Sequence, residues 1–525
     1  MQVEDAPLTG RSVNRIGAAA GFAGLAGATA ILAVVNLVAP AVPFPPFQAA
    51  QALIRATPGG LATAAIERLG HLALPLATFG AALLFVASGT LVGILALRLS
   101  RSGGVRAWAV AMGTLWAVWF AIAPSRSMHP GAYLVAAAVG TATAAWVAAS
   151  VAGRLRAAPP PPPDAPDDPT RRYLFRAGAA GVGGVLLGMS GLSSLIRPSS
   201  DPGGRPLSLA SVSAAPPASP GAADASFAKI PGLTPEVTPL RDFYTIDEAI
   251  VDPSLDAESW RLRISGLVDR PVDLTYADLT DMRAVERPQT LSCVSNPVGG
   301  GLMSTAVWTG IPMREVLQRA GADPGRAVEV VFRSADGYSN SLSFEQAMDP
   351  ETLLALGMNG RTLPRAHGYP ARLLATGTYG TKNPKWVTSI EVVDAPYDGY
   401  WEQRGWAKVA PVKTGARIDT VRDGDEVSGT VTVAGVAFAG DRGISAVEVS
   451  TDAGASWNPA LLKSALGPFT WRLWRYDWRP EEPGQALVVA RARDGEGTVQ
   501  TATVAGPHPD GASGLHEVTV TVTGA

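Results

Sequence analysis

Long apolar runs without a charged residue dominate the first 160 positions of the chain. They occupy residues 16–38, 71–97, 107–123 and 132–152, and each approaches the ~20 residues with which a helix crosses a bilayer core. Cytoplasmic loops carry the excess of Lys and Arg. The arginines on one side of these runs are Arg11, Arg15, Arg98, Arg101, Arg106, Arg154 and Arg156, against Arg55, Arg68 and Arg126 on the other. The pattern predicts an all-α transmembrane bundle of four helices over residues 1–156, with both ends in the cytoplasm.

A linker region follows over residues 157–226. It begins with the proline run 159–163, which favours a stiff, extended spacer. The apolar stretch 177–196 predicts a fifth transmembrane segment. The pair Arg171 and Arg172 before it indicates either a twin-arginine export signal or an ordinary cytoplasmic flank. Both interpretations place the chain beyond residue 196 outside the cytoplasm, and residues 197–226, rich in Pro, Ser, Ala and Gly, predict a flexible tether.

Residues 227–406 mix two hydrophobic periods. Strand-like patterns occur at 259–266, 327–332, 372–375 and 387–393, and helix-like patterns at 313–320 and 344–347. The mixture predicts an α+β domain.

Residues 407–525 show short alternating segments separated by turn residues. The predicted strands are 429–438, 444–451, 469–474, 486–492 and 517–522. This spacing predicts an all-β sandwich of the immunoglobulin type. The aromatic run 471–478 is interpreted as core or interface packing.

Composition narrows the function classes. The chain has 525 residues, a net charge of −2 and only 17% charged residues, so it offers no electrostatic case for nucleic acid binding. Its single cysteine excludes an internal disulfide and a cysteine-rich metal cluster. That cysteine, Cys293, lies in T-L-S-C-V-S-N-P-V-G-G-G, residues 290–301.

Three motifs in order carry a resemblance to a known family. After the cysteine segment come V-W-T-G-I-P-M-R-E-V-L from position 307, M-N-G-R-T-L-P-R-A-H-G-Y-P-A-R-L-L over 358–374, and G-T-K-N-P-K-W over 380–386. Together they resemble the sulfite oxidase family of molybdenum–molybdopterin enzymes, from about residue 233 to the C-terminus. The resemblance implies a sulfite-oxidase-type molybdopterin domain over 227–406 and a dimerisation-type domain over 407–525. It also implies one pterin per molybdenum.

The resemblance also assigns site residues. Cys293 falls at the family's molybdenum ligand, and Trp406 aligns with its active-site tyrosine. The cofactor-binding positions are matched by Tyr244, Thr245, Asp336, His367, Arg372, Asn383 and Lys385. Without the surrounding motifs, Cys293 would be interpreted as a buried free thiol. His367 would then be a turn histidine, and Arg372 and Lys385 solvated surface charges.

The chain departs from the family where sulfite is held. Val298 occupies the position where the sulfite-oxidising members have an arginine. Thr245 and Ile246 lie at a second arginine position of the family, and Glu517 lies at a third. A divalent oxyanion in a dry pocket needs charge-assisted donors. We therefore expect a neutral oxygen-atom donor or acceptor, such as a sulfoxide, with sulfite oxidation proper as the alternative.

The remaining expectations concern partners and location. No C-x-x-C-H motif occurs and the apolar runs hold no deep histidine, so the sequence does not favour a haem, and a separate electron carrier or the quinone pool is expected. The family implies a homodimer through the C-terminal domain. We expect a multi-pass cell-membrane protein embedded in lipid, with its catalytic domains on the extracytoplasmic side. The rival hypotheses are a metal-free binding or scaffold module and a transporter with a sensor domain.

Overall fold

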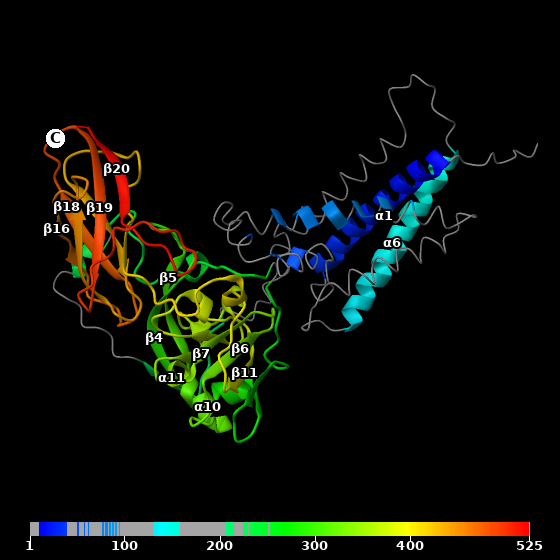
Figure 1. Ribbon diagram of the computed structural model, residues 1–525, viewed down its shortest axis with the longest axis horizontal. Coiled ribbons are helices and arrows are strands. Elements are labelled where there is room, and N and C mark those ends of the chain that lie inside the picture. The colour runs from blue at the N-terminus through cyan, green and yellow to red at the C-terminus, as the bar shows by residue number, and fades with distance from the viewer. Residues whose placement is uncertain are drawn as a thin grey trace, which may run out of the picture. The chain divides into compact units, whose positions relative to one another are not determined.

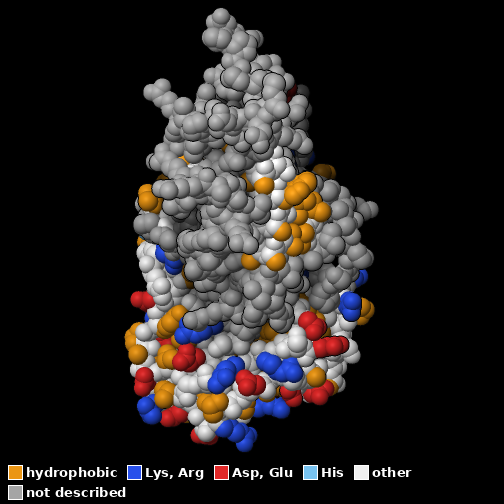
Figure 2. Space-filling model, turned by 90° about the vertical axis from the view of Figure 1, so that its right-hand side faces the viewer, with side chains coloured by type: hydrophobic (Ala, Val, Ile, Leu, Met, Phe, Trp, Pro, Cys, Tyr) orange, Lys and Arg blue, Asp and Glu red, His pale blue; other side chains and the backbone are white. Residues whose placement is uncertain are grey.

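The computed structural model describes residues 10–38, 50–51, scattered positions between 57 and 94, and residues 130–157, 205–214, 224–228, 230–249 and 252–523. The chain divides into two compact units. One comprises residues 1–200 with 249–251, and the other residues 201–248 with 252–525. Each unit is described by itself. Where the described surface carries charge, Lys and Arg intermingle with Asp and Glu (Figure 2).

The first unit contains two long helices that lie side by side, α1 (Gly10–Val38) and α6 (Pro130–Ala157) (Figure 1). Small residues allow their close approach, because a Cβ at Gly24 would lie 2.7 Å from the carbonyl oxygen of Ala144. Both helices agree with the predicted runs 16–38 and 132–152. The runs 107–123 and 177–196 lie outside the described residues, and 71–97 is described only in fragments.

Among the described residues, one helix is long and apolar enough to cross a membrane. Its apolar window is Ala18–Val35, with a mean hydropathy of 2.0, and α6 contains the shorter apolar segment Ala136–Val151. The large apolar side chains of Ile31 and Trp146 are exposed on these helices. The predicted four-helix bundle therefore stays a prediction beyond this helix pair.

The α+β part of the second unit consists of two sheets. The first has the order β1-β4-β5-β8-β10, with β9 paired to β8. Its strands are β1 (Ser211–Ala214), β4 (Arg283–Ser292), β5 (Met303–Pro312), β8 (Leu353–Met358), β9 (Arg361–Thr362) and β10 (Arg372–Leu374). The second sheet has the order β3-β2-β11-β6-β7. Its strands are β2 (Arg261–Gly266), β3 (Val272–Thr275), β6 (Glu329–Ser334), β7 (Ser339–Ser343) and β11 (Val387–Val393).

Both sheets contribute to one apolar core together with α10 (Met313–Ala320). This helix buries Met313, Val316 and Leu317 at helical spacing and ends at Gly321, whose positive φ closes the last turn. The shorter helices are α9 (Tyr276–Thr280) and α11 (Phe344–Met348). The predicted α+β class and the helix over 313–320 are confirmed.

The segment 205–214 is docked on this domain, which corrects the prediction of a flexible tether up to residue 226. Strand β1 pairs in parallel with β4, Leu209 packs against the core, and the amide of Thr362 donates to the carbonyl of Arg205 at 2.9 Å. Residues 224–227 form a 3-10 helix whose Phe227 is buried. The composition of this segment is that of a tether, but it includes leucines spaced among polar residues. These leucines and the open edge of β4 allow the segment to form ordered contacts.

The C-terminal part is a two-sheet β-sandwich, as predicted. One sheet has the order β12-β14-β18-β17 and the other β13-β20-β19-β15-β16. The strands are β12 (Gly415–Ile418), β13 (Glu426–Val427), β14 (Val431–Phe438), β15 (Ile444–Ser450), β16 (Asn458–Pro459), β17 (Leu461–Leu462), β18 (Arg472–Trp478), β19 (Gly484–Asp494) and β20 (His516–Val522). Trp474 and Trp478 lie in its core. Core packing of the aromatic run is therefore confirmed, and the immunoglobulin type stays a prediction.

Candidate functional site

Cys293 follows the last residue of β4 and begins a tight loop. Its amide donates to the carbonyl of Leu302 at 2.9 Å, and the amide of Leu302 donates to the side-chain oxygen of Asn296 at 2.9 Å. The thiol lies 3.0 Å from the hydroxyl of Ser295. Burial raises the pKa of the Cys293 thiol, and the hydrogen bond from Ser295 opposes that rise. The loop thus presents a buried sulfur with one hydroxyl already directed at it.

Arg372 on β10 is a buried cation beside this loop. Its guanidinium donates to the carbonyls of His367 at 3.2 Å and Asn383 at 3.1 Å and lies over the ring of Trp308. Its Nε has no acceptor among the described residues. Burial lowers the pKa of Arg372 to about 10, opposed by Tyr244 and Asp247, so the charge persists at neutral pH. A buried charge with an unsatisfied donor favours an anionic or polar ligand.

His367 lies at the end of a short 3-10 helix, η4 (Arg365–His367). Its Nε2 is 3.4 Å from the carbonyl oxygen of Leu240, and its ring meets that of Phe243 edge to face at 5.3 Å. Burial, with the nearby charges of Arg372 and Lys385, lowers the pKa of His367 to about 4. The imidazole is therefore neutral at physiological pH and lies near two cations.

Lys385 is the second cation of the site and forms an ion pair with Asp247. Its ammonium also donates to the carbonyl of Ala366 at 2.8 Å and lies over the ring of Trp386. Burial lowers the pKa of Lys385, and Asp247 counters this shift. Asp247 was not predicted as a site residue, although it is the last residue of the motif D-F-Y-T-I-D.

Tyr244 approaches the cysteine from the same segment as Asp247. Its ring stacks on Phe243 at 5.6 Å, and its amide donates to the hydroxyl of Ser304 at 3.2 Å. Burial, and then the charge of Cys293, raises the pKa of Tyr244. The structure thus brings together Tyr244, Cys293, His367, Arg372 and Lys385, drawn from segments far apart in the sequence.

Three of the predicted cofactor-binding residues have other roles. The side chain of Asn383 is engaged with Ala375 and Tyr379, so it fixes the loop itself. Asp336 accepts the amide of Tyr338 in the turn between β6 and β7. Thr245 is exposed.

Trp406 lies in a neighbouring apolar cluster with Val294, the residue after the cysteine. Its indole N–H has no acceptor among the described residues.

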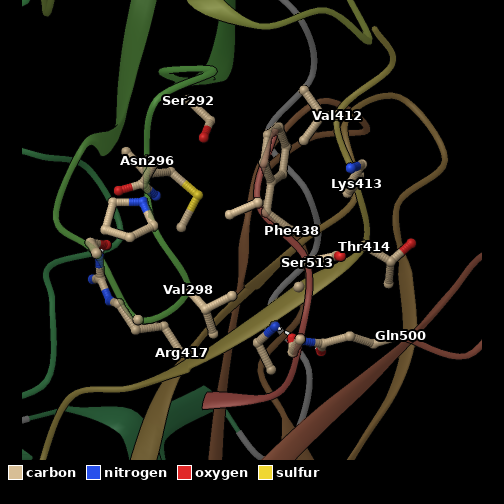
Figure 3. A pocket seen from close by; sticks show the side chains of 18 of the residues that line it. Ser292, Asn296, Val298, Val412, Lys413, Thr414, Arg417, Phe438, Gln500 and Ser513 are labelled. Atoms are coloured by element: carbon tan, nitrogen blue, oxygen red, sulfur yellow. Dashed lines mark hydrogen bonds between the residues drawn. The ribbon is translucent and has the colours of Figure 1, made fainter. Parts of the chain in front are cut away.

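A cavity of about 90 Å³ adjoins the cysteine loop on the side of the β-sandwich (Figure 3). Val298 and Phe438 face it from its two walls. Cys293 itself does not line it, although Ser292 and Tyr379 do. The cavity is therefore adjacent to the thiol and lies at the junction of the two domains.

The cations that line this cavity are already paired. Lys413 donates to Asp510 at 3.0 Å and to the carbonyl of Gly511. Arg417 pairs with Asp419 at 2.6 Å and donates to the carbonyl of Gly300 at 3.1 Å. Among the lining residues that the structure describes, no cation is left for an anion.

The donor set fits a molybdenum–pterin cofactor. No group of three or more His, Cys, Asp or Glu side chains among the described residues could hold a metal by itself, so the thiolate of Cys293 would be a single protein ligand. Soft thiolates suit such metals. Arg372 and Lys385 supply positive charge and hydrogen bonds for a phosphate and a polar ring.

Comparison with known proteins identifies both domains. Residues 249–401 match the oxidoreductase molybdopterin binding domain, and residues 409–505 match the Mo-co oxidoreductase dimerisation domain. Human mitochondrial sulfite oxidase is 31% identical over 318 residues, covering 51% of this chain and 58% of that protein. The chain thus spans little more than half of the length of this relative.

Two further relatives are named for other reactions. Nitrate reductase of Hordeum vulgare is 34% identical over 194 residues, covering 32% of this chain and 22% of that protein. The provisionally named protein-methionine-sulfoxide reductase subunit YedZ1 of Azospira oryzae is 33% identical over 168 residues, covering 32% of this chain and 61% of that protein. The sulfane dehydrogenase SoxCD of Paracoccus pantotrophus aligns with a TM-score of 0.49 at 22% identity, over 55% of this chain and 85% of that one.

Proposed function

Because the chain belongs to the sulfite oxidase family of molybdopterin-dependent oxidoreductases, we propose that it transfers an oxygen atom to or from a neutral, sulfoxide-like substrate. The enzyme is anchored in the cell membrane and faces away from the cytoplasm. The cofactor, when bound, supplies two-electron oxygen-atom transfer at molybdenum. The protein holds that group and selects the substrate.

The residues of the site divide this work. Cys293 supplies the thiolate ligand, and the hydroxyl of Ser295 at 3.0 Å orients and polarises the sulfur. Arg372 and Lys385 hold the anionic part of the cofactor. His367, neutral because of its burial, offers a ring nitrogen without adding a third positive charge. Tyr244 closes the site from the opposite segment.

The observation that supports a neutral substrate is that the cavity beside the cysteine loop has no unpaired cation among its described lining residues. Val298 lines it, and its two lining cations, Lys413 and Arg417, are already bound to carboxylates. An oxyanion placed there would have to compete with Asp510 for Lys413 or with Asp419 for Arg417, and the second of these pairs is largely buried, so breaking it is costly. A neutral S=O or N–O group needs only ordinary hydrogen-bond donors.

Sulfite oxidation is the second candidate, supported by the 31% identity to sulfite oxidases. The test compares both reactions in the purified, molybdenum-loaded protein. We expect small sulfoxides to be reduced by a reduced dye at least tenfold faster, as kcat/KM, than sulfite is oxidised by an electron acceptor. Faster turnover of sulfite would contradict the proposal. If the purified protein is folded but contains no molybdenum and turns over neither substrate, the result would favour the metal-free binding module.

The partners follow from the same chemistry. Two-electron turnover needs a separate electron carrier or the quinone pool, and the match to a dimerisation domain over 409–505 supports a homodimer. The apolar window Ala18–Val35 and the predicted runs beyond it support anchoring in lipid.

A further inference from the structure

Tyr379 is a buried tyrosine next to the cysteine loop that the cofactor site does not use. It precedes the 3-10 helix η5 (Gly380–Lys382). Its side chain belongs to the apolar cluster of Val294 and Trp406 and lines the cavity of Figure 3. Burial raises the pKa of its hydroxyl, and the nearby charges of Asp510 and, to a smaller extent, Cys293 raise it further. The phenol therefore borders the cavity and lies within electrostatic range of the thiol.

The hydroxyl of Tyr379 has one unused hydrogen. Its oxygen accepts the amide N–H of Lys413 at 3.1 Å. Its own O–H has no acceptor among the described residues, although the side chain is only 5% exposed. Buried hydroxyl groups normally donate a hydrogen bond. A buried O–H without an acceptor next to a cavity therefore indicates a ligand that accepts this hydrogen bond.

The chain makes room for this hydroxyl with a glycine. Gly511 adopts a φ of +98°, and a Cβ added there would lie 2.3 Å from the tyrosine oxygen. The loop 507–511 that contains Gly511 also contacts Trp406, whose ring meets that of His508 at 5.2 Å. The carbonyl of Pro509 accepts the amide of Ala407 at 3.0 Å. One loop thus positions both unpaired donors, the phenol of Tyr379 and the indole of Trp406.

From this arrangement we infer that Tyr379 donates a hydrogen bond to the oxygen of the neutral substrate and so determines specificity for an S=O or N–O group. The inference rests on the proposed function. The phenol is uncharged and lies in an apolar cluster, which suits a polar neutral oxygen and supplies no charge to bind an anion. A lone pair of the substrate oxygen accepts this bond, and no proton is transferred in the contact.

The test uses the full-length, molybdenum-loaded protein with Tyr379→Phe. The matched control is Tyr476→Phe, a tyrosine packed on the core of the β-sandwich. Two ligands are compared: a small dialkyl sulfoxide, and the corresponding thioether, which has the same carbon groups and no oxygen. We expect Tyr379→Phe to lower kcat/KM for the sulfoxide by about tenfold to a hundredfold. Its molybdenum content and the inhibition constant of the thioether should stay at the parent values.

The ligand pair separates a donor from a merely structural residue. A tyrosine that only supports the loop would weaken the sulfoxide and the thioether alike, and that result would overturn the inference. An unchanged sulfoxide kcat/KM in Tyr379→Phe would overturn it too, while leaving the proposed function intact. If the parent enzyme turns over no neutral oxygen compound, the proposed function fails and this inference fails with it.

Discussion

At the residue scale, the site is organised by burial of charge around one sulfur. Arg372 and Lys385 are both desolvated, and each keeps its charge by bonding to carbonyl oxygens and, for Lys385, to Asp247. Because Asp247 pairs with Lys385 and no carboxylate among the described residues forms an ion pair with Arg372, the buried charge of Arg372 is costly unless a counter-charge arrives. A cofactor phosphate is such a counter-charge, which explains why the site concentrates positive charge next to a thiol.

The thiolate ligand gives the first prediction. Cys293→Ser replaces a soft sulfur by a hard hydroxyl at a position 7% exposed, so molybdenum in the purified protein should fall at least tenfold, while the thermal midpoints of the cofactor-free variant and the cofactor-free parent should be similar. Metal analysis of the variant and of Ser295→Ala, which keeps the sulfur, measures this. Equal molybdenum in Cys293→Ser and the parent would contradict ligation by this residue.

His367 gives a pH prediction. Its pKa is about 4 in the folded chain against 6.5 when unperturbed, so between these values the unfolded chain binds the extra proton. Stability should therefore fall as the pH falls from 6.5 to 4, by at most about 1.4 kcal/mol per pH unit. Denaturation of the cofactor-free protein at several pH values measures the slope. His367→Gln removes the titrating group, and a slope equal to that of the parent would refute the assignment.

Sequence motifs selected residues that the fold brings into one region around Tyr244, but they did not identify Asp247 or Tyr379. Cys293, His367, Arg372 and Lys385 lie in short distinctive strings, whereas the partner of Lys385 is 138 positions away in the chain. Pairing over such a distance leaves no local period. The unused proton of Tyr379 likewise depends on Lys413 and Gly511, which only the fold brings to it.

At the element scale, a buried ion pair joins the cofactor loop to the loop of Trp406. Lys382, in η5, pairs with Glu402, in the 3-10 helix η6 (Glu402–Arg404). The ammonium also donates to Asn340 at 2.8 Å. Both side chains are at most 12% exposed, so the pair fixes the spacing of the two loops in a medium of low polarity.

Removing one charge of this pair should be expensive. Glu402→Gln keeps the size and an acceptor but leaves the ammonium of Lys382 buried without a counter-charge, so we expect a loss of about 3–5 kcal/mol in the free energy of unfolding. Asp394→Asn is the matched control, because its pair with Arg326 is 64% and 60% exposed and should contribute less than about 1 kcal/mol. Urea denaturation compares them, and equal losses would contradict the role of burial.

The elements differed in how far they could be predicted. Helix α10 was found because Met313, Val316 and Leu317 repeat at helical spacing. Strand β8 was missed because all six of its residues are buried, and a strand buried on both faces has no alternation. The same holds for much of β5, which carries only two partly exposed residues among ten.

At the scale of the whole molecule, the catalytic unit begins earlier than its family domains. The compact unit starts at residue 201, whereas the first family match starts at 249. The segment 205–214 adds strand β1 to the edge of β4, and Leu209 adds apolar contacts to the core. The composition of this segment suggested a tether. Its order could not be predicted locally, because it depends on pairing with β4, more than 70 positions later in the chain.

This boundary gives the last prediction. A chain that starts at residue 201 should fold and bind molybdenum, whereas one that starts at 215 exposes the backbone of β4 and loses the contacts of Leu209. We expect the free energy of unfolding of the shorter chain to be lower by about 2–3 kcal/mol, and we expect its copies to associate with one another through the open edge of β4. Val212→Pro in the longer chain tests the same point without shortening it, because proline fixes φ and removes a backbone N–H within the strand that pairs with β4. Val212→Thr is its control at a side chain 48% exposed. Denaturation and light scattering measure both effects. If the two chains are equally stable and Val212→Pro is as soluble as Val212→Thr, the segment contributes nothing to the sheet. A strand that completes the sheet cannot be removed or broken without exposing the backbone of its neighbour β4.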